Sequence, residues 1–226
     1  MDSLGPATIS FYKSNINLMD NETIRQAIFI HNGKSENEKF LFENEDKNHI
    51  DLFFAKRRVR TGFIVNNDQL VEKEQIYFSR YYIGVIGSFL FVNADKSLSY
   101  SIIQKISRSI PEIEIQQLKV DLIRFYTFLT NQCVSVHPLK LELADISLSK
   151  FMNGHFIGDI SNKQAFFETL TTYRGKIQSY TVDVIDKGGK EYRLKISSNS
   201  SIFIQRRTKD FIHLFDIIID FFKEDI

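Results

Sequence analysis

The sequence predicts a mixed α+β fold with a mainly antiparallel sheet. Apolar and polar residues alternate in segments such as Ser179–Ile185, which is typical of a half-buried strand. Apolar residues recur at helical spacing in other segments, most clearly in Lys96–Ile110 and Asp210–Lys223. Asp186–Gly189 predicts a tight hairpin turn between two strands, because glycine adopts the positive φ that such turns require.

The composition is that of an ordinary globular chain. The 226 residues are 43% hydrophobic and 25% charged, so we expect a packed core throughout. The formal net charge of +1 excludes a generic polyanion binder and leaves local clusters as the candidate phosphate sites. Cys133 is the one cysteine, so no intramolecular disulfide is expected, and a reducing, cytoplasmic compartment is favoured.

We expect neither a targeting segment nor a membrane span. Met1–Tyr12 lacks the basic and apolar regions of a secretory signal. The longest apolar run, Tyr81–Ala94, is shorter than the roughly 20 residues that a bilayer span needs, and it contains glycine. A buried strand is the better interpretation of this run.

The N-terminal segments are predicted to be mainly strands. Ala7–Tyr12 predicts the first strand, and Glu22–Ala27 predicts a short helix that is followed by a strand at Ile28–Ile30. Asn32-Gly33 is a turn signal, and the acidic segment Ser35–Asn48 indicates a loop or an exposed hairpin.

The central segments predict strands and then two helices. Ile50–Val92 contains two or three antiparallel strands, and the helix Lys96–Ile110 follows. A second helical series runs over Ile115–Leu129, although its alternating first residues also fit a strand. Val134–Leu143 then alternates as a strand that Pro138 interrupts.

The C-terminal segments predict a small unit of helix, hairpin, strand and helix. A helix at Lys163–Tyr173 precedes the two hairpin arms, Ser179–Ile185 and Glu191–Ile196. Ser201–Gln205 is the third strand, and Asp210–Lys223 is the last helix.

The domain boundary is predicted near residue 146. The segment 147–161 is rich in small and polar residues, which favours a division there. The chain would then consist of an N-terminal α+β region, 1–146, and a small C-terminal α+β unit, 147–226. A single domain is the alternative.

The first candidate phosphate site is a run of cations, Lys56, Arg57, Arg58 and Arg60. Four cations within five positions attract phosphates electrostatically. On a strand, Arg58 and Arg60 share one face while Arg57 points the other way. The alternative is a solvated strand that pairs with the acidic stretch Glu36–Asp46.

The second candidate phosphate site is Arg206, Arg207 and Lys209, between the last strand and the last helix. The N–H groups at a helix N-terminus also favour anions, so two physical effects support phosphate binding there. Arg193 and Lys195 lie just upstream on a hairpin arm. The alternative is that these cations are solvated and aid solubility.

Three acids form a nuclease-like pattern that represents the enzymatic alternative. Glu168 lies on a predicted helix, Asp183 on one hairpin arm and Glu191 on the other, as in restriction-type nucleases. Two acids there would bind a divalent metal. The chain departs from that pattern because Arg193 stands where a lysine is needed, and arginine stays protonated.

The last helix is unusually apolar. Ile217, Ile218 and Ile219 cannot share one narrow stripe, so the helix is either fully covered or in contact with a protein partner or a second copy. No P-loop, dinucleotide-binding or nucleophile-elbow motif occurs, and no cofactor or resident metal is expected.

Taken together, these features favour a non-enzymatic binding or assembly component. It would engage a protein partner, with nucleic-acid phosphates as a further candidate ligand of the basic clusters. A metal-dependent nuclease-like enzyme and a protein-only accessory subunit are the alternatives.

Overall fold

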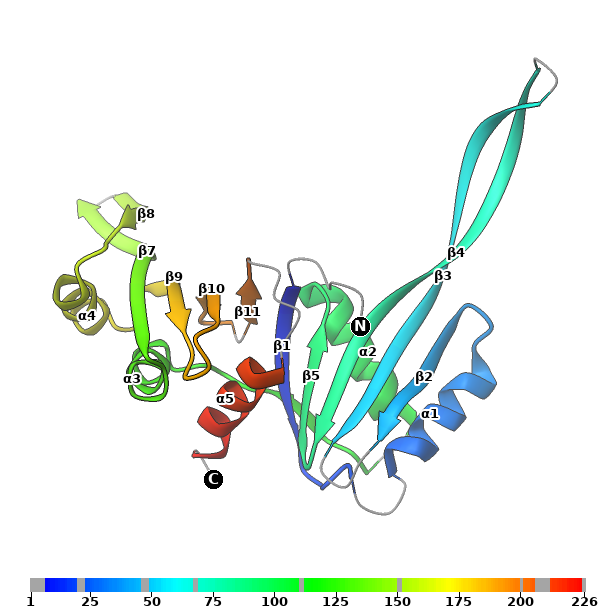
Figure 1. Ribbon diagram of the computed structural model, residues 1–226, viewed down its shortest axis with the longest axis horizontal. Coiled ribbons are helices and arrows are strands. Elements are labelled where there is room, and N and C mark those ends of the chain that lie inside the picture. Colours follow the sequence, from blue (N-terminus) through cyan, green and yellow to red (C-terminus); the bar gives the residue numbers. More distant parts are fainter. Residues whose placement is uncertain are drawn as a thin grey trace. The chain divides into compact units, whose positions relative to one another are not determined.

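The structure is a computed structural model that describes residues 7–19, 23–45, 49–66, 69–109, 112–149, 152–199, 201–205 and 212–224. The chain divides into two compact units. The inner unit is Phe11–Gln116, and the terminal unit combines Met1–Ser10 with Gln117–Ile226. Both units combine helices with antiparallel strand pairs, so the predicted mixed α+β fold is confirmed (Figure 1).

The inner unit is built on a sheet whose strands lie in the order β2-β3-β4-β5-β1, with β6 paired beside β1. The pairings of β2 with β3, of β3 with β4 and of β4 with β5 are antiparallel. Its elements in chain order are β1 (Ala7–Ser14, shared with the terminal unit), α1 (Thr23–Lys34), β2 (Glu38–Glu45), β3 (Ile50–Asn66), β4 (Gln69–Ile86), β5 (Phe89–Asn93), α2 (Lys96–Ser109) and β6 (Ile115–Gln117).

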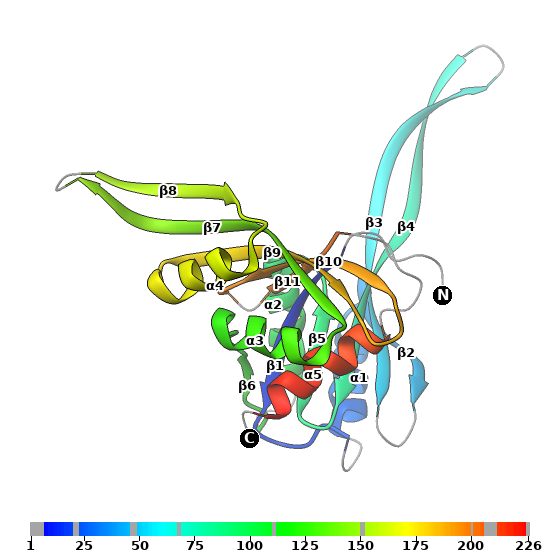
Figure 2. The same cartoon turned by 60° about the vertical axis from the view of Figure 1, so that its left-hand side comes forward.

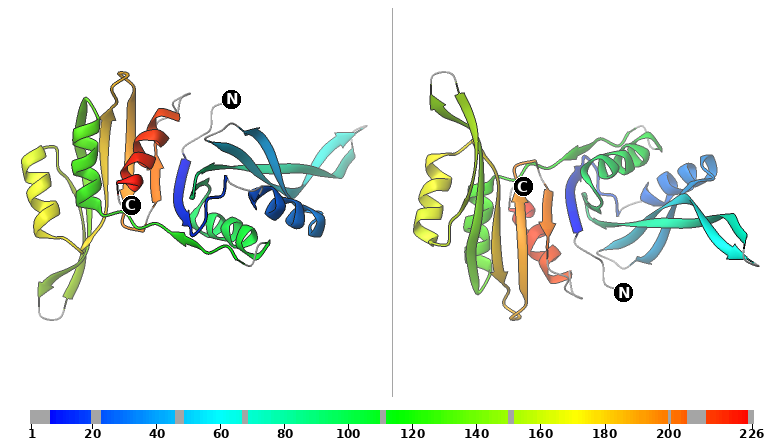
Figure 3. Two further views of the ribbon diagram at one scale, coloured as in Figure 1. Left: turned by 90° about the horizontal axis from the view of Figure 1, so that it is seen from below. Right: turned by 90° about the horizontal axis from the view of Figure 1, so that it is seen from above.

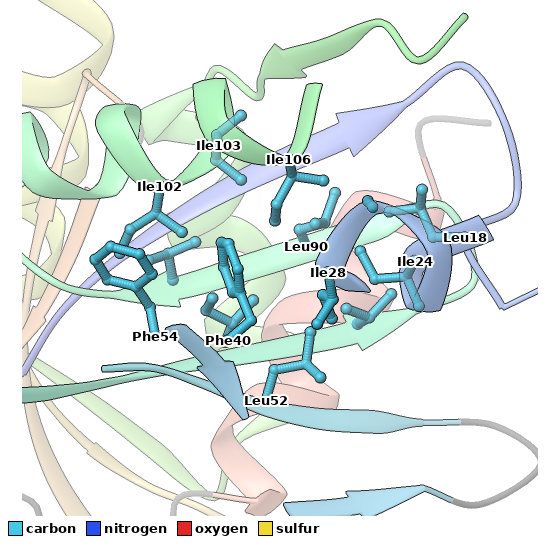
Figure 4. Close-up of a cluster of buried hydrophobic side chains, with 14 of the residues drawn as sticks. Leu18, Ile24, Ile28, Phe40, Leu52, Phe54, Leu90, Ile102, Ile103 and Ile106 are labelled. Carbon is cyan, nitrogen blue, oxygen red and sulfur yellow. The ribbon is translucent and has the colours of Figure 1, made fainter. Parts of the chain in front are cut away.

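The core of the inner unit lies between this sheet and its two helices. β3 contributes the alternate residues Leu52 and Phe54, and α2 contributes Ile102 and Ile106 at helical spacing (Figure 4). Phe40 of β2 packs on Phe54, with the ring centroids 5.1 Å apart. Burial of each such side chain stabilises the fold by about 1.5–3 kcal/mol. This layer therefore fixes which face of β3 points towards the helices.

The terminal unit contains the strands in the order β1-β11-β10-β9-β7-β8, and each of these neighbouring pairs is antiparallel (Figure 3). Its N-terminal strand is the first part of β1, where Ala7 to Ser10 pair with β11. The other elements in chain order are α3 (Leu122–Gln132), β7 (Ser135–Ser149), β8 (Met152–Asp159), α4 (Lys163–Thr172), β9 (Ile177–Ile185), β10 (Glu191–Ser197), β11 (Ser201–Ile204) and α5 (Ile212–Lys223).

Aromatic side chains fill the space between the helices and the sheet of the terminal unit. Tyr126 of α3 contacts Phe166 of α4 and Tyr180 of β9, with ring centroids 4.9 and 6.0 Å apart. Phe125 of α3 contacts Phe221 of α5 at 4.7 Å. The three helices thus share one apolar layer. None of the helices in the described part of the chain is long and apolar enough to cross a membrane.

The hairpin of β9 and β10 is confirmed, with the predicted turn at Asp186–Gly189. Gly189 has a φ of +76°, the conformation for which the turn selects glycine. Asp186 closes the loop, because its carboxylate accepts a hydrogen bond of 2.9 Å from the backbone N–H of Lys190.

The prediction for Ile28–Ile30 and Asn32-Gly33 is wrong, because α1 continues as a helix through both. Ile24, Ala27 and Ile28 are buried at helical spacing, whereas Phe29 is 80% exposed. Packing of this apolar stripe in the inner core overrides the β propensity of three consecutive β-branched and aromatic residues.

The segment predicted as a loop or exposed hairpin contains β2. This strand pairs with β3 from Glu38↔Lys56 to Glu45↔Ile50, with a register shift after Phe42. The strand carries acidic and polar residues because it lies at the edge of the sheet, where one side meets solvent.

The compact units divide the chain at places that differ from the predicted boundary. Their limits fall between Ser10 and Phe11 and between Gln116 and Gln117. Residue 146 lies inside β7, which pairs with both β8 and β9. A division after residue 146 would therefore cut a strand in the interior of the terminal sheet.

A substitution at Gly84 tests the packing at the centre of the inner sheet. Gly84 lies opposite Phe91, and a Cβ at this position would overlap the buried Phe91 ring. We expect Gly84→Ala to lower the free energy of unfolding by about 1–3 kcal/mol, measured by urea denaturation. Gly62→Ala is the matched control, because a Cβ there meets no atom within 4 Å. Equal stability of the two variants would contradict this packing.

Candidate nucleic-acid interface on a two-stranded arm

β3 and β4 extend as a ribbon beyond the rest of the inner sheet (Figures 1 and 2). They pair without a break from Ile50↔Val85 to Asn66↔Gln69. Pairing of β2 stops at Lys56, and pairing of β5 begins at Ile83, so no third strand pairs with the ribbon beyond these positions. We call the two-stranded part, residues 57–66 and 69–78, the arm. Ten residues of strand make it roughly 30 Å long.

One face of the arm is basic. Residues that lie directly opposite in an antiparallel pair share a face, and successive residues alternate between faces. Arg58 lies opposite Tyr77, Arg60 opposite Gln75, and Gly62 opposite Lys73. We call this surface the basic face, and its three cations are all exposed.

The basic face carries no acidic side chain among those that the structure describes. The nearest acids in sequence, Glu72 and Glu74, flank Lys73 and therefore point to the opposite face. Arg58, Arg60 and Lys73 form no ion pair with a described side chain. Three uncompensated cations on one exposed strip make a local positive potential that the overall net charge of +1 conceals.

The four cations predicted from the sequence have different surroundings. Arg58 and Arg60 lie on the basic face, as the alternation predicts. Lys56 shares their face, but its Nζ is 3.0 Å from a carboxylate oxygen of Glu38. Arg57 points to the other face and donates a long hydrogen bond of 3.4 Å to Asn37. Of the four cations, Lys56 therefore pairs with an acid, whereas Arg58 and Arg60 stay candidates for phosphate binding.

Lys73 was missed in the sequence because its neighbours are glutamates. The residues around Lys73 in the sequence have a negative summed charge, so this stretch does not indicate a basic surface. The alternation of a strand separates Lys73 from both acids, and the register of β4 against β3 places it next to Arg60. Strand alternation is the signal that would have found it.

Glu38 holds the base of the arm to α2. Its two carboxylate oxygens are each 3.0 Å from an ammonium nitrogen, one of Lys56 on β3 and one of Lys105 on α2. Burial raises the pKa of Glu38, but the hydrogen bonds from Lys105 and Lys56 outweigh it and leave the pKa below its usual value. The carboxylate is therefore a structural anchor for one cation of the cluster.

A buried carboxylate, Asp51, lies on the opposite face at the base of β3. The Tyr82 hydroxyl donates a hydrogen bond to it, and the Nε2 atom of His49 is 3.0 Å away. Burial and the bond to Asp51 raise the pKa of Tyr82 well above its ordinary value, so the phenol remains a donor. These contacts join the first residues of β3 to β4 on the face opposite the one that packs on α1 and α2.

The second predicted cluster, Arg206, Arg207 and Lys209, lies outside the described residues. Its upstream neighbours are described and are paired. Lys195 lies 2.8 Å from Glu142, and Arg193 forms a two-pronged ion pair with Asp183. These two cations stabilise the terminal sheet and are not available as free phosphate ligands.

The three nuclease-like acids do not form one cluster, although Asp183 and Glu191 lie on the same face of the hairpin of β9 and β10. Both Asp183 oxygens accept hydrogen bonds of 2.7 Å from Arg193. Glu168 lies on α4 and accepts a bond from Gln164, on the side of the sheet where Tyr180 is buried and away from Asp183. No group of three His, Cys, Asp or Glu side chains in the described part of the chain could hold a metal ion.

The apolar excess of α5 is covered where its side chains are described. Leu214, Ile218, Ile219, Phe221 and Phe222 are buried, and Ile217 is partly buried. Of the two predicted alternatives, this burial favours a covered helix over a partner-binding one.

No family model matches the chain, and no curated protein matches it. The arm combines exposure, a fixed register and cations that form no ion pair with a described side chain, whereas Arg193 and Lys195 are paired. It is the strongest candidate functional site among the residues that the structure describes.

The anchoring role of Glu38 can be tested by pH. Because its folded pKa is lowered, its contribution to stability is present above the unfolded pKa of about 4.3 and is lost as the pH falls through the folded value. We expect Glu38→Gln to lower the free energy of unfolding by about 1 kcal/mol at pH 7. The difference from the original chain should shrink below about pH 4 in urea denaturation.

Glu36→Gln is the matched control, because Glu36 is exposed and forms no ion pair with a described side chain. The same loss of stability in both variants, or a loss for Glu38→Gln that persists unchanged in acid, would contradict the anchoring role.

Proposed function

We propose that the protein is a non-enzymatic binding component whose arm engages the phosphates of nucleic acid through the basic face. The observation that supports the proposal is the set of three exposed cations, Arg58, Arg60 and Lys73, on one face, where the described side chains include no acid and form no ion pair with them. Cations on a regular framework neutralise phosphates and release the counterions around them.

The shape of the arm fits duplex DNA. The major groove, about 12 Å wide, admits a two-stranded β-ribbon. On the basic face, Gln75 and Tyr77 lie opposite the two arginines and provide hydrogen-bonding groups beside the charges. Arg58 and Arg60 are two residues apart on one strand, so they lie about 7 Å apart along the ribbon. Such a ribbon would follow the groove while its cations contact the backbone.

The proposed role is binding and not catalysis. The acids of the enzymatic alternative, Glu168, Asp183 and Glu191, form no metal cluster, and Asp183 is engaged by Arg193. The proposal includes a cytoplasmic location, for which the lone and buried Cys133 is the support. A protein partner remains part of the proposal, with the arm and not α5 as the contact surface.

Salt dependence of binding tests the proposal. We expect the chain to bind a fluorescein-labelled 20-base-pair duplex with a steep salt dependence in fluorescence anisotropy. Arg58→Gln combined with Arg60→Gln should weaken binding roughly 10- to 100-fold at 0.1 M salt and make the slope of log K against log salt shallower by about 1.8.

Arg57→Gln is the matched control, because Arg57 is the adjacent cation in sequence but lies on the opposite face. It should leave the slope unchanged. No binding at low salt, or equal losses from Arg57→Gln and Arg58→Gln, would contradict the proposal. The same anisotropy titration with single-stranded DNA and with duplex RNA of the same length would show which form of nucleic acid the arm binds most tightly.

A further inference from the structure

The face of the arm opposite the basic face carries a series of exposed apolar side chains. Its apolar side chains range in exposed fraction from 52% for Val59 to 74% for Leu70. An isolated two-stranded ribbon is marginally stable in water, and a contiguous exposed apolar patch marks an interaction surface. We call this surface the apolar face, and its members are Val59, Phe63, Leu70, Ile76 and Phe78.

Charged side chains on this face are divided by sign about its centre: Arg57 and Arg80 lie towards the base, and Glu72 and Glu74 lie towards the tip. Val59 and Ile76 form the directly opposed pair at its centre. Along β4, Arg80 lies four residues from Ile76 towards the base, and Glu72 lies four residues from it towards the tip. Both side chains point to the apolar face and are exposed. Neither forms an ion pair with a described side chain.

This pattern is self-complementary. We propose that the apolar face binds a second copy of the same face, with a two-fold axis through the Val59–Ile76 pair. A two-fold axis that lies between the arms and perpendicular to their strands reverses the strand direction. It places Ile76 against the Ile76 of the second copy and Arg80 against the Glu72 of the second copy. The apolar centre is then covered, and the ion pair between Arg80 and Glu72 forms twice, once in each half of the dimer. Arg57 lies in the half of Arg80 and Glu74 in the half of Glu72, so the cationic half of each copy faces the acidic half of the other.

The charge pattern selects a second copy over other occupants. An isologous interface requires one surface to complement itself, and a cation and an acid equally spaced about an apolar centre meet that requirement. The inference does not rest on the proposed nucleic-acid binding, since it concerns the opposite face of the arm. Its geometry leaves both basic faces pointing outward, so nucleic acid and self-association would use the arm without competing.

Association should be weak and concentration-dependent. A ribbon two strands wide and roughly 30 Å long gives a small interface, for which micromolar affinity is expected. Sedimentation analysis of the full chain from about 1 to about 200 µM should show a shift from monomer to dimer. Ile76→Thr combined with Phe78→Thr should weaken the dimer at least about tenfold, because it removes the apolar centre and keeps strand-forming residues.

A charge exchange gives the decisive test. Arg80→Glu alone sets acid against acid in the dimer, and Glu72→Arg alone sets cation against cation, so each variant should remain monomeric. An equimolar mixture of the two should associate, because every facing pair is then opposite in sign. Recovery in the mixture also shows that both variants fold.

Gln75→Glu places a new acid on the basic face and should leave self-association unchanged. A chain that stays monomeric over the whole concentration range would overturn the inference and leave the apolar face to a different protein. A dimer that is indifferent to the arm variants, or variants that fail to associate when mixed, would overturn it as well.

Discussion

The register of β3 against β4 is the constraint on which the rest of the candidate site depends. The two strands pair without a bulge over their whole length, and the buried base of the ribbon fixes their alignment. Leu52 and Ile83 lie opposite each other in the inner core, and Phe54 lies opposite Tyr81 one step further out. A slip by one residue would turn these apolar side chains away from the helices. The core therefore dictates, residue by residue, which side chains of the distant arm share a face.

That alignment separates charges that the sequence mixes. In the chain, Lys73 stands between two glutamates and Arg57 precedes Arg58, yet the fold sends each neighbour to the opposite side. The charges of one strip are all positive among the described side chains, and the other strip carries exposed apolar residues with cations towards the base and acids towards the tip. A single two-stranded ribbon thus presents two chemically distinct surfaces. The exposed apolar residues of this ribbon are the feature from which we infer a binding surface.

Several other cations of the chain are already paired with acids. Lys56 and Lys105 converge on Glu38, Lys195 is held by Glu142, and Arg193 by Asp183. Each of these pairs joins different elements of its unit, and each is at least partly shielded from solvent. The acid in such a pair restricts the side chain of the cation and cancels part of its positive potential. A paired cation therefore attracts phosphate less than a cation without a partner. Local density of lysine and arginine is for this reason a poor guide to where an anion binds.

The sequence by itself determined the fold class and many of the elements, because hydrophobic periodicity is a local property. The alternation in Ser179–Ile185 and the spacing in Lys96–Ile110 correspond to β9 and α2. Only the tertiary structure decided that α1 continues through Ile28–Ile30, because its packing on residues far along the chain outweighs local propensity. The same holds for the arm, since Lys73 joins Arg60 only through strand register. Register follows from contacts between residues distant in sequence, and no local window of the chain records them.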